Sequence, residues 1–139
     1  MYLLDTNILS ELRKVRAGRA NPGVASWADD VDGSDLFVSA VTLEEIEIGV
    51  LLVERRDEWQ GEVLRNWFRQ QVIPAFADRV LPIDTAVALR SARLHVPNPR
   101  AIRDAYIAAT ALVHGLRLVT RNVADFDGCG ATLLNPWLD

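Results

Sequence analysis

The stretch Tyr2-Leu3-Leu4-Asp5-Thr6-Asn7 is a short apolar run that ends in a carboxylate, and a helical pattern of apolar residues starts directly after it. It predicts a buried strand that ends at Asp5, followed by a helix near residues 8–15 with Thr6 or Asn7 as its cap. Open α/β sheets bind their ligands at the carboxyl ends of parallel strands. We therefore expect an α/β fold in which Asp5 lies at the functional edge of the sheet.

Apolar runs of strand length alternate with helical patterns along the rest of the chain. This alternation predicts a three-layer α/β/α fold with a mostly parallel sheet, in a single domain that spans residues 1–139. Further strands are expected at residues 36–39, 81–83, 116–119 and 132–134. Helices are expected at residues 22–32, 42–54, 57–72, 85–95 and 102–114, with Thr42 and Asp84 as caps and Gly115 closing the last helix.

The overall charge argues against binding nucleic acid through bulk electrostatics, because the net charge is -4. Lys14 is the only lysine among the 15 basic residues. Nearly all of the positive charge is therefore arginine, which suits bidentate contacts with phosphate. A compositional bias explains the arginine content equally well.

The cysteine content and the apolar runs indicate where the protein works. Cys129 is the only cysteine, so the chain forms no intrachain disulfide, which fits a reducing compartment. The N-terminus has no basic lead, and Asp5 interrupts its apolar stretch, so we expect no signal peptide. The longest apolar run, around residues 105–113, is far shorter than the ~20 residues that span a bilayer. We expect a cytoplasmic protein that does not enter a membrane.

Three later segments carry oxygen-bearing side chains at positions similar to that of Asp5. Glu45 follows the second expected strand, Asp104 begins the last expected helix, and Asn122 and Asp125 follow the fourth strand. A parallel sheet brings these segments to one edge, where carboxylates repel one another and a divalent cation relieves the repulsion. Oxygen ligands without a Cys/His cluster predict Mg²⁺ rather than zinc. Such a site supports phosphodiester hydrolysis by a metal-activated water.

Each carboxylate also has a structural explanation. Asp5 and Asp125 are suited to capping a helix and a turn, and Glu45 to completing a capping box with Thr42. Asp104 complements the dipole at a helix start. Capping explains each residue alone but not the convergence of all of them, so we favour the metal site.

Four segments, in order along nearly the whole chain, resemble the motifs of PIN domains, and specifically those of the VapC-type ribonuclease toxins of bacterial toxin–antitoxin modules. No single motif is specific, but four in order at suitable spacing are. The segments are Leu4-Asp5-Thr6-Asn7-Ile8-Leu9-Ser10-Glu11, Ser39-Ala40-Val41-Thr42-Leu43-Glu44-Glu45-Ile46 with Gly49-Val50, Asp104-Ala105-Tyr106-Ile107-Ala108-Ala109-Thr110-Ala111, and Val119-Thr120-Arg121-Asn122 with Asp125-Phe126.

The resemblance implies a PIN-like fold in which Asp5, Glu45 and Asp104 are the catalytic acids. Together with Asn122 they are expected to bind Mg²⁺, for which Mn²⁺ can substitute. The fourth family position is often acidic, and Asn122 adds no charge. Asp125 is therefore an alternative fourth ligand.

Residues beside these acids have expected roles as well. Thr6 and Thr120 are expected to support the carboxylates with their hydroxyl groups. Glu44 is adjacent to Glu45 but points about 100° away on the helix. The side chains expected to hold RNA phosphates, with solvated helix faces as the alternative, are Arg13, Lys14, Arg100 and Arg103. The two tryptophans expected in a groove or dimer face, with core packing as the alternative, are Trp59 and Trp67.

The resemblance further implies an RNA substrate, a homodimer and a cognate antitoxin, through which the protein also contacts operator DNA. Such an antitoxin inserts a C-terminal segment into a groove and a basic side chain into the acidic pocket. A second hypothesis is a nucleic-acid-binding regulator with marginal cleavage, which the neutral Asn122 keeps open. A hydrolase of small phosphorylated substrates is disfavoured, because the chain has no Gly-rich phosphate loop.

Overall fold

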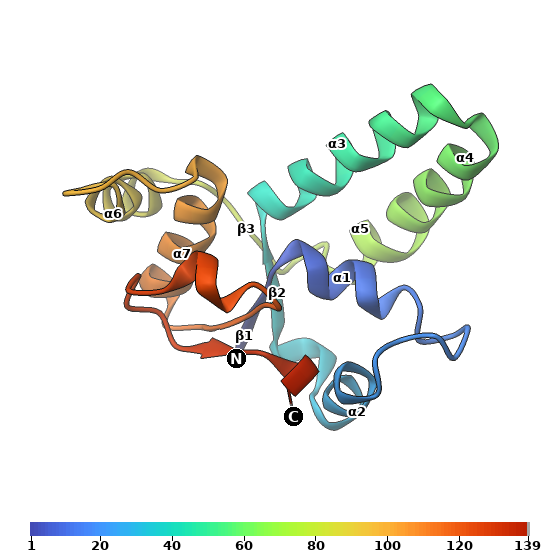
Figure 1. Cartoon of the computed structure of the whole chain (residues 1–139), viewed down its shortest axis with the longest axis horizontal. Helices are drawn as coiled ribbons and strands as arrows, with labels where there is room; N and C mark the ends of the chain where they lie inside the picture. The colour runs from blue at the N-terminus through green and yellow to red at the C-terminus, as the bar shows by residue number, and fades with distance from the viewer. Residues whose placement is uncertain (139) are drawn as a thin grey trace.

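The computed structural model describes residues 1–138 and has a central five-stranded sheet (Figure 1). All neighbouring strands run parallel, in the order β3-β2-β1-β4-β5, which confirms the predicted sheet. The strands are β1 (Tyr2–Leu4), β2 (Leu36–Ser39), β3 (Val80–Leu81), β4 (Arg117–Val119) and β5 (Leu133–Leu134).

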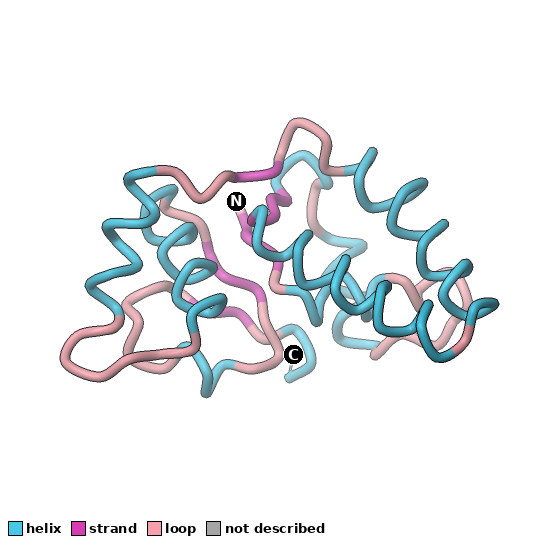
Figure 2. Tube along the Cα trace, turned by 90° about the horizontal axis from the view of Figure 1, so that it is seen from above, coloured by secondary structure: helices cyan, strands magenta, loops and turns pink. Residues whose placement is uncertain are grey.

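Helices lie on both sides of the sheet, so the three-layer prediction is also confirmed. In Figure 2 the magenta strands lie between two groups of cyan helices. One group contains α6 and α7, and the other contains the helices from α1 to α5. The helices are α1 (Thr6–Leu12), α2 (Pro22–Asp30), α3 (Ala40–Arg56), α4 (Glu58–Trp67), α5 (Ile73–Ala75), α6 (Thr85–Leu94) and α7 (Ile102–His114). Short 3₁₀ turns lie at Gly33–Asp35, Val123–Phe126 and Pro136–Leu138.

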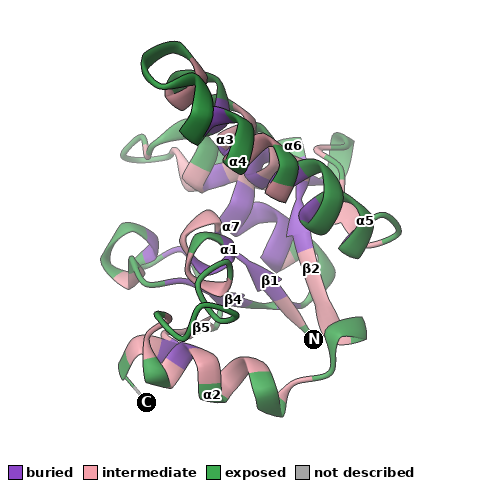
Figure 3. Ribbon diagram, turned by 90° about the vertical axis from the view of Figure 1, so that its right-hand side faces the viewer, coloured by how far each residue is buried: buried purple, intermediate pink, exposed green. Residues whose placement is uncertain are grey.

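The first strand supplies both cores, because successive side chains of a strand point to opposite faces. Leu4 belongs to a cluster with Ile8 and Val38, and Leu3 belongs to a separate cluster with Ile107. All of these side chains are fully buried. In Figure 3 much of β1 and α7, at the centre of the molecule, is coloured purple for buried. Burial of β1 on both faces places the residue that follows it at a fixed point on the sheet edge.

Two predicted helix starts, those of α1 and α3, are wrong. In each case the cap is an earlier residue than predicted, located at the end of the preceding strand or directly after it. Asp5 accepts the Thr6 backbone N–H, so α1 begins at Thr6 and neither Thr6 nor Asn7 is its cap. The structural explanation of Asp5 as a helix cap is thereby confirmed. Ser39 ends β2, and its hydroxyl accepts the Val41 N–H at 3.0 Å, so α3 begins at Ala40. Thr42 therefore lies inside the helix, fully buried, and its hydroxyl has no partner among residues 1–138.

The helix predicted for residues 57–72 changes character before its end. After α4 the chain continues as a π-helical turn, η2 (Phe68–Val72), in which the Ile73 N–H donates to the Phe68 carbonyl. Pro74 follows, and it has no N–H for a regular α-helical bond. The predicted cap Asp84 and the left-handed Gly115, with φ 66°, are confirmed. Within residues 1–138, no helix combines the length and the apolar character that a membrane span requires.

Candidate active site

Asp5 is held at the carboxyl end of β1, and only 6% of its surface is exposed. Its Oδ1 accepts the Thr6 N–H at 2.8 Å. Its Oδ2 accepts the Thr120 hydroxyl at 2.8 Å and the Asn7 amide at 3.3 Å. Burial raises the pKa of Asp5, and the charge of Asp125 adds to the rise, although the hydrogen bonds oppose it. Both carboxylate oxygens are thus fixed at the sheet edge.

Thr6 connects two of the acids. Its backbone N–H binds Asp5, and its hydroxyl donates to Glu45 Oε1 at 2.7 Å. This second contact joins the first turn of α1 to α3. Glu45 is half-buried, whereas the neighbouring Glu44 is exposed. The Thr6 contact therefore selects Glu45 as the acid of α3 that belongs with Asp5.

Asp104 lies in the first turn of α7, across a cleft from Glu45. Burial raises the pKa of Asp104 to about 6, with further contributions from the charges of Asp5, Asp125 and Glu45. Arg103 lowers this pKa, but no hydrogen bond from residues 1–138 does so. The acids of four separate segments therefore interact electrostatically. The cleft is lined by Glu44, Glu45, Ala101, Ile102, Arg103 and Asp104.

The loop after β4 brings a further carboxylate to the site. The Thr120 hydroxyl, which donates to Asp5, also accepts the Asn122 backbone N–H at 3.0 Å. Asn122 and Asp125 are both exposed. Asp125 acts on both Asp5 and Asp104, because its charge raises the pKa of each. Asn122 is connected to the acids through its backbone.

Asn7, which the sequence predicts only as a helix cap, belongs to the site. Its amide Nδ2 donates to Asp5 and, at 3.3 Å, to the Thr120 hydroxyl. Its Oδ1 accepts the Arg121 N–H at 3.2 Å. The only signal in the sequence is its place directly after Asp5-Thr6. Asn7 joins the start of α1 to the loop after β4.

The acids do not form a ready-made ligand set for a metal. Among residues 1–138, no three His, Cys, Asp or Glu side chains lie in a group suited to holding an ion directly. The donor chemistry nevertheless fits a hard cation, because all the acids offer oxygen and Arg103 compensates their mutual repulsion only in part. Mg²⁺ retains several waters and is commonly held through only one or two carboxylates. The arrangement thus suits an ion that keeps part of its water shell.

The four basic residues expected to bind RNA differ in their surroundings. Lys14 pairs with Glu11 at 3.2 Å, and the Arg100 guanidinium donates to a backbone carbonyl at 2.6 Å, so both make contacts within the fold. Arg103 lines the cleft of the acids. Arg13 has no ion pair within residues 1–138 and lines a groove.

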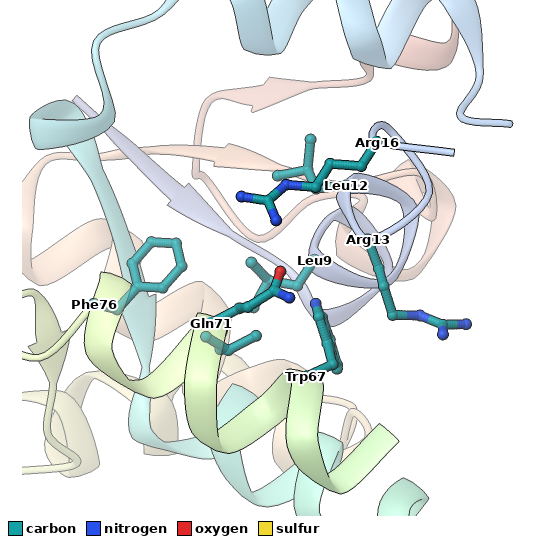
Figure 4. A pocket seen from close by; sticks show the side chains of 8 residues that line it. Leu9, Leu12, Arg13, Arg16, Trp67, Gln71 and Phe76 are labelled. Carbon is teal, nitrogen blue, oxygen red and sulfur yellow. The ribbon is translucent and has the colours of Figure 1, made fainter. Parts of the chain in front are cut away.

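This groove lies between α1 and the segment formed by α4 and η2, and Figure 4 shows its side chains. The Arg13 guanidinium lies 5.8 Å from the centre of the Trp67 ring. A second section of the groove is also lined by Arg13 and Trp67, and it extends to Thr6 and Glu45. Trp67 therefore lines the groove, whereas Trp59 is 69% exposed elsewhere on α4. The first section is lined by Leu9, Leu12, Arg13, Arg16, Trp67, Gln71, Val72 and Phe76.

Comparison with known proteins assigns this arrangement to a family. The chain matches the PIN domain family model over residues 2–127. It belongs to the PIN domain family. It is 35% identical over 144 residues to Toxin FitB of Neisseria gonorrhoeae, with 100% of both chains covered. It is 34% identical over 142 residues to VapC ribonuclease Y4jK of Sinorhizobium fredii, covering 99% of this chain and 98% of the relative.

A solved structure supports the same assignment. The structure of FitAB bound to IR36 DNA fragment contains a chain that is 34% identical and superposes with a TM-score of 0.87. The match covers 99% of this chain and 96% of that chain. The fold predicted from the sequence and its identification as PIN-like are thus both confirmed.

Proposed function

We propose that this PIN domain is the toxin of a type II toxin–antitoxin module and acts as an endoribonuclease that depends on a divalent cation. The carrying observation is that Thr6 joins Asp5 to Glu45 at the sheet edge, while Asp104 lies across a cleft from Glu45. The charges of Asp5, Asp125 and Glu45 raise the pKa of Asp104, which agrees with this placement. The similarity to proteins named as a toxin and as a VapC ribonuclease supports this function.

The residues that would hold the cation are Asp5, Glu45, Asp104 and Asn122, with Asp125 as the alternative to Asn122. Mg²⁺ fits the oxygen donors, and Mn²⁺ is a suitable substitute. When bound, such an ion supplies a water of lowered pKa and stabilises charge on the leaving oxygen.

The chain's own residues position these acids. Thr120 and the Thr6 N–H fix the two oxygens of Asp5, and the Thr6 hydroxyl holds Glu45. Asp104 lacks such bonds within residues 1–138, so its oxygens are available to a ligand in the cleft. Loss of Asp5 would therefore disturb the most highly organised acid of the site.

The proposal includes a cognate antitoxin, a homodimer and operator DNA reached through the antitoxin. The groove along α1 suits a segment of the antitoxin, because its apolar walls continue to Glu45. A basic side chain of that segment placed among the acids would neutralise their repulsion and keep the cation out. Inhibition would follow directly from the charge of the site.

The test is cleavage of RNA by the purified chain with Mg²⁺, with a chelator, and after Asp5→Asn. Asp57→Asn is the matched control, because Asp57 caps α4 on the surface and Asn caps a helix equally well. We expect cleavage by the wild type and by Asp57→Asn with Mg²⁺ only, and none by Asp5→Asn. Equal cleavage by wild type and Asp5→Asn would contradict the proposal.

The alternative is a nucleic-acid-binding regulator. The neutral and exposed Asn122 favours it, because an acidic residue often occupies this position in the family and Asn122 contributes no charge to the site. In that case the wild type with its antitoxin would bind operator DNA, and no Mg²⁺-dependent cleavage above that of Asp5→Asn would be measured.

A further inference from the structure

The backbone of Arg121 is held next to the residues that bind Asp5. It directly follows Thr120, whose hydroxyl binds the most buried carboxylate of the site. Its N–H donates to Asn7 at 3.2 Å, and its carbonyl accepts the Asn135 amide at 3.4 Å. Asn135 in turn accepts the Trp137 N–H at 3.0 Å. The Arg121 backbone is thus fixed from α1 and from the C-terminal turn.

The side chain of Arg121 is exposed, and its guanidinium lies 5.4 Å from the centre of the Trp137 ring. Stacking orients a guanidinium while leaving the N–H donors at its edge unused. Arg121 makes no ion pair within residues 1–138. Its charge lowers the pKa of Glu11, but that carboxylate is already engaged by the Asn21 N–H at 2.8 Å and by Lys14 at 3.2 Å.

Other arginines use their donors to hold the fold together. Arg65 binds carboxylates of α3, Arg79 binds two backbone carbonyls, and Arg100 binds the carbonyl of Asp127. Arg121 differs from these three because a ring and a fixed backbone orient it, while its guanidinium makes no hydrogen bond or ion pair within residues 1–138. An oriented guanidinium of this kind is suited to binding an anion from outside the protein.

We propose that Arg121 binds a phosphate of the RNA strand beside the bond to be cut, and that Trp137 orients its guanidinium. The inference rests on the proposed function. The acids repel the phosphates that they must approach, and a cation at their rim reduces this repulsion and helps to hold the strand. Arg121 is one residue from Thr120, and its planar fork suits two oxygens of one phosphate. Arg121 is a substrate-binding residue in this scheme, and Trp137 is a positioning residue.

Arg117 provides a matched control from the opposite end of β4. It is also exposed and lies 6.0 Å from the centre of an aromatic ring, that of Tyr2. Steady-state cleavage of single-stranded RNA should show KM raised about tenfold in Arg121→Ala, with little change in kcat, because one charge-assisted contact is lost. Arg117→Ala should match the wild type. Arg121→Lys should be intermediate, because it keeps the charge without the fork.

The role of Trp137 is tested separately. Trp137→Leu should raise KM about threefold, because the guanidinium is retained but no longer oriented. Trp137→Phe keeps a ring and should lie closer to the wild type. Thermal unfolding of both variants accompanies the kinetics, since Trp137 also packs against the core. KM unchanged in a folded Trp137→Leu would remove the positioning role.

Binding of RNA to Asp5→Asn, with and without Arg121→Ala, separates this inference from the proposed function. Each phosphate contact contributes about 0.7 to the slope of log affinity against log salt for single strands, so Arg121→Ala should lower the slope by about that amount. If the wild type does not cleave RNA but the slope falls, the ribonuclease proposal fails and the phosphate contact stands. Unchanged slope and KM in Arg121→Ala, or an equal loss in Arg117→Ala, would overturn the contact. A loss of antitoxin affinity alone would also overturn it and assign Arg121 to the protein partner.

Discussion

Two charged clusters of this PIN domain are built in opposite ways. On the α3–α4 hairpin, Arg65 lies between Glu47 and Glu54 and binds both. These contacts raise the pKa of Arg65 and lower the pKa of Glu54. At the sheet edge, carboxylates face one another, and burial together with the neighbouring charges raises the pKa of Asp104 to about 6.

The difference separates structural from functional charge. Opposite charges satisfy each other on the hairpin, so that cluster contributes to packing and needs no ligand. Like charges at the sheet edge disfavour the ionised state of their neighbours and so oppose folding. An unbalanced cluster of this kind is expected where a ligand of opposite charge binds.

The largest effect is expected at the unbalanced cluster, which comprises Asp5, Glu45, Asp104 and Asp125. Glu45→Gln should lower kcat for RNA cleavage by roughly 10²- to 10³-fold, because the amide removes a charge from the site while keeping a hydrogen-bond acceptor for Thr6. Glu44→Gln makes the same chemical change on the adjacent, exposed residue and should retain wild-type activity. Equal losses in the two variants would show that general charge, rather than the Thr6-bound acid, governs cleavage.

The next largest effect is expected on the α3–α4 hairpin, where Arg65 pairs with Glu47 and Glu54. Gly61 is buried, and a Cβ there would lie 2.6 Å from the Cα of Glu54 on the facing helix. Gly61→Ala should therefore lower the free energy of unfolding by about 1–3 kcal/mol, measured by urea denaturation, because the two helix backbones must move apart. Gly49→Ala on α3, where an added Cβ meets nothing within 4 Å, is the control. A Gly61→Ala variant as stable as Gly49→Ala would contradict the close packing of α3 and α4.

The smallest effect has the opposite sign. Asp104→Asn should stabilise the chelator-treated protein at pH 7, because it removes a charge that its neighbours repel. A rise in pKa from 3.8 to about 6 corresponds to ~3 kcal/mol, which we reduce to ~1 kcal/mol because the carboxyl is partly solvated.

The gain from Asp104→Asn has a defined pH dependence. The folded-state pKa of Asp104 is raised, so the wild-type carboxyl takes up a proton as the pH falls through about 6. The stability gain should therefore become smaller as the pH is lowered from 6 to 3.8. Added Mg²⁺ should also reduce the difference by stabilising the wild type. Urea denaturation at several pH values measures both effects. A variant less stable than the wild type at pH 7 with chelator present would contradict the repulsion.

The sequence predicts what depends on neighbouring residues. The apolar run before Asp5 specifies β1, and Asp84 and Gly115 specify helix ends, because each acts through its own local backbone. The cap of α3 was predicted wrongly because Thr42 and Ser39 carry the same chemical group. Only the exact end of β2 determines which of the two hydroxyls meets the free N–H groups.

The contacts within the site could not be predicted in this way. The Thr6–Glu45 bond joins residues 39 apart in sequence, and the Thr120–Asp5 bond joins residues 115 apart. Motif order indicates that these segments meet, but it does not say which oxygen binds which donor. The bond between Asn7 and Arg121 was missed for the same reason, because it forms only when β1 and β4 are neighbours in the sheet.

The most direct test of the central claim is an anomalous difference map from crystals of this protein soaked in Mn²⁺. The unbalanced cluster should bind the ion, so a peak is expected among Asp5, Glu45 and Asp104, within direct or water-mediated reach of their carboxylates, and it should vanish in crystals of Asp5→Asn. A map with no peak there, or with its only peak beside Glu47 and Glu54, would contradict the claim that unsatisfied like charge marks the active site.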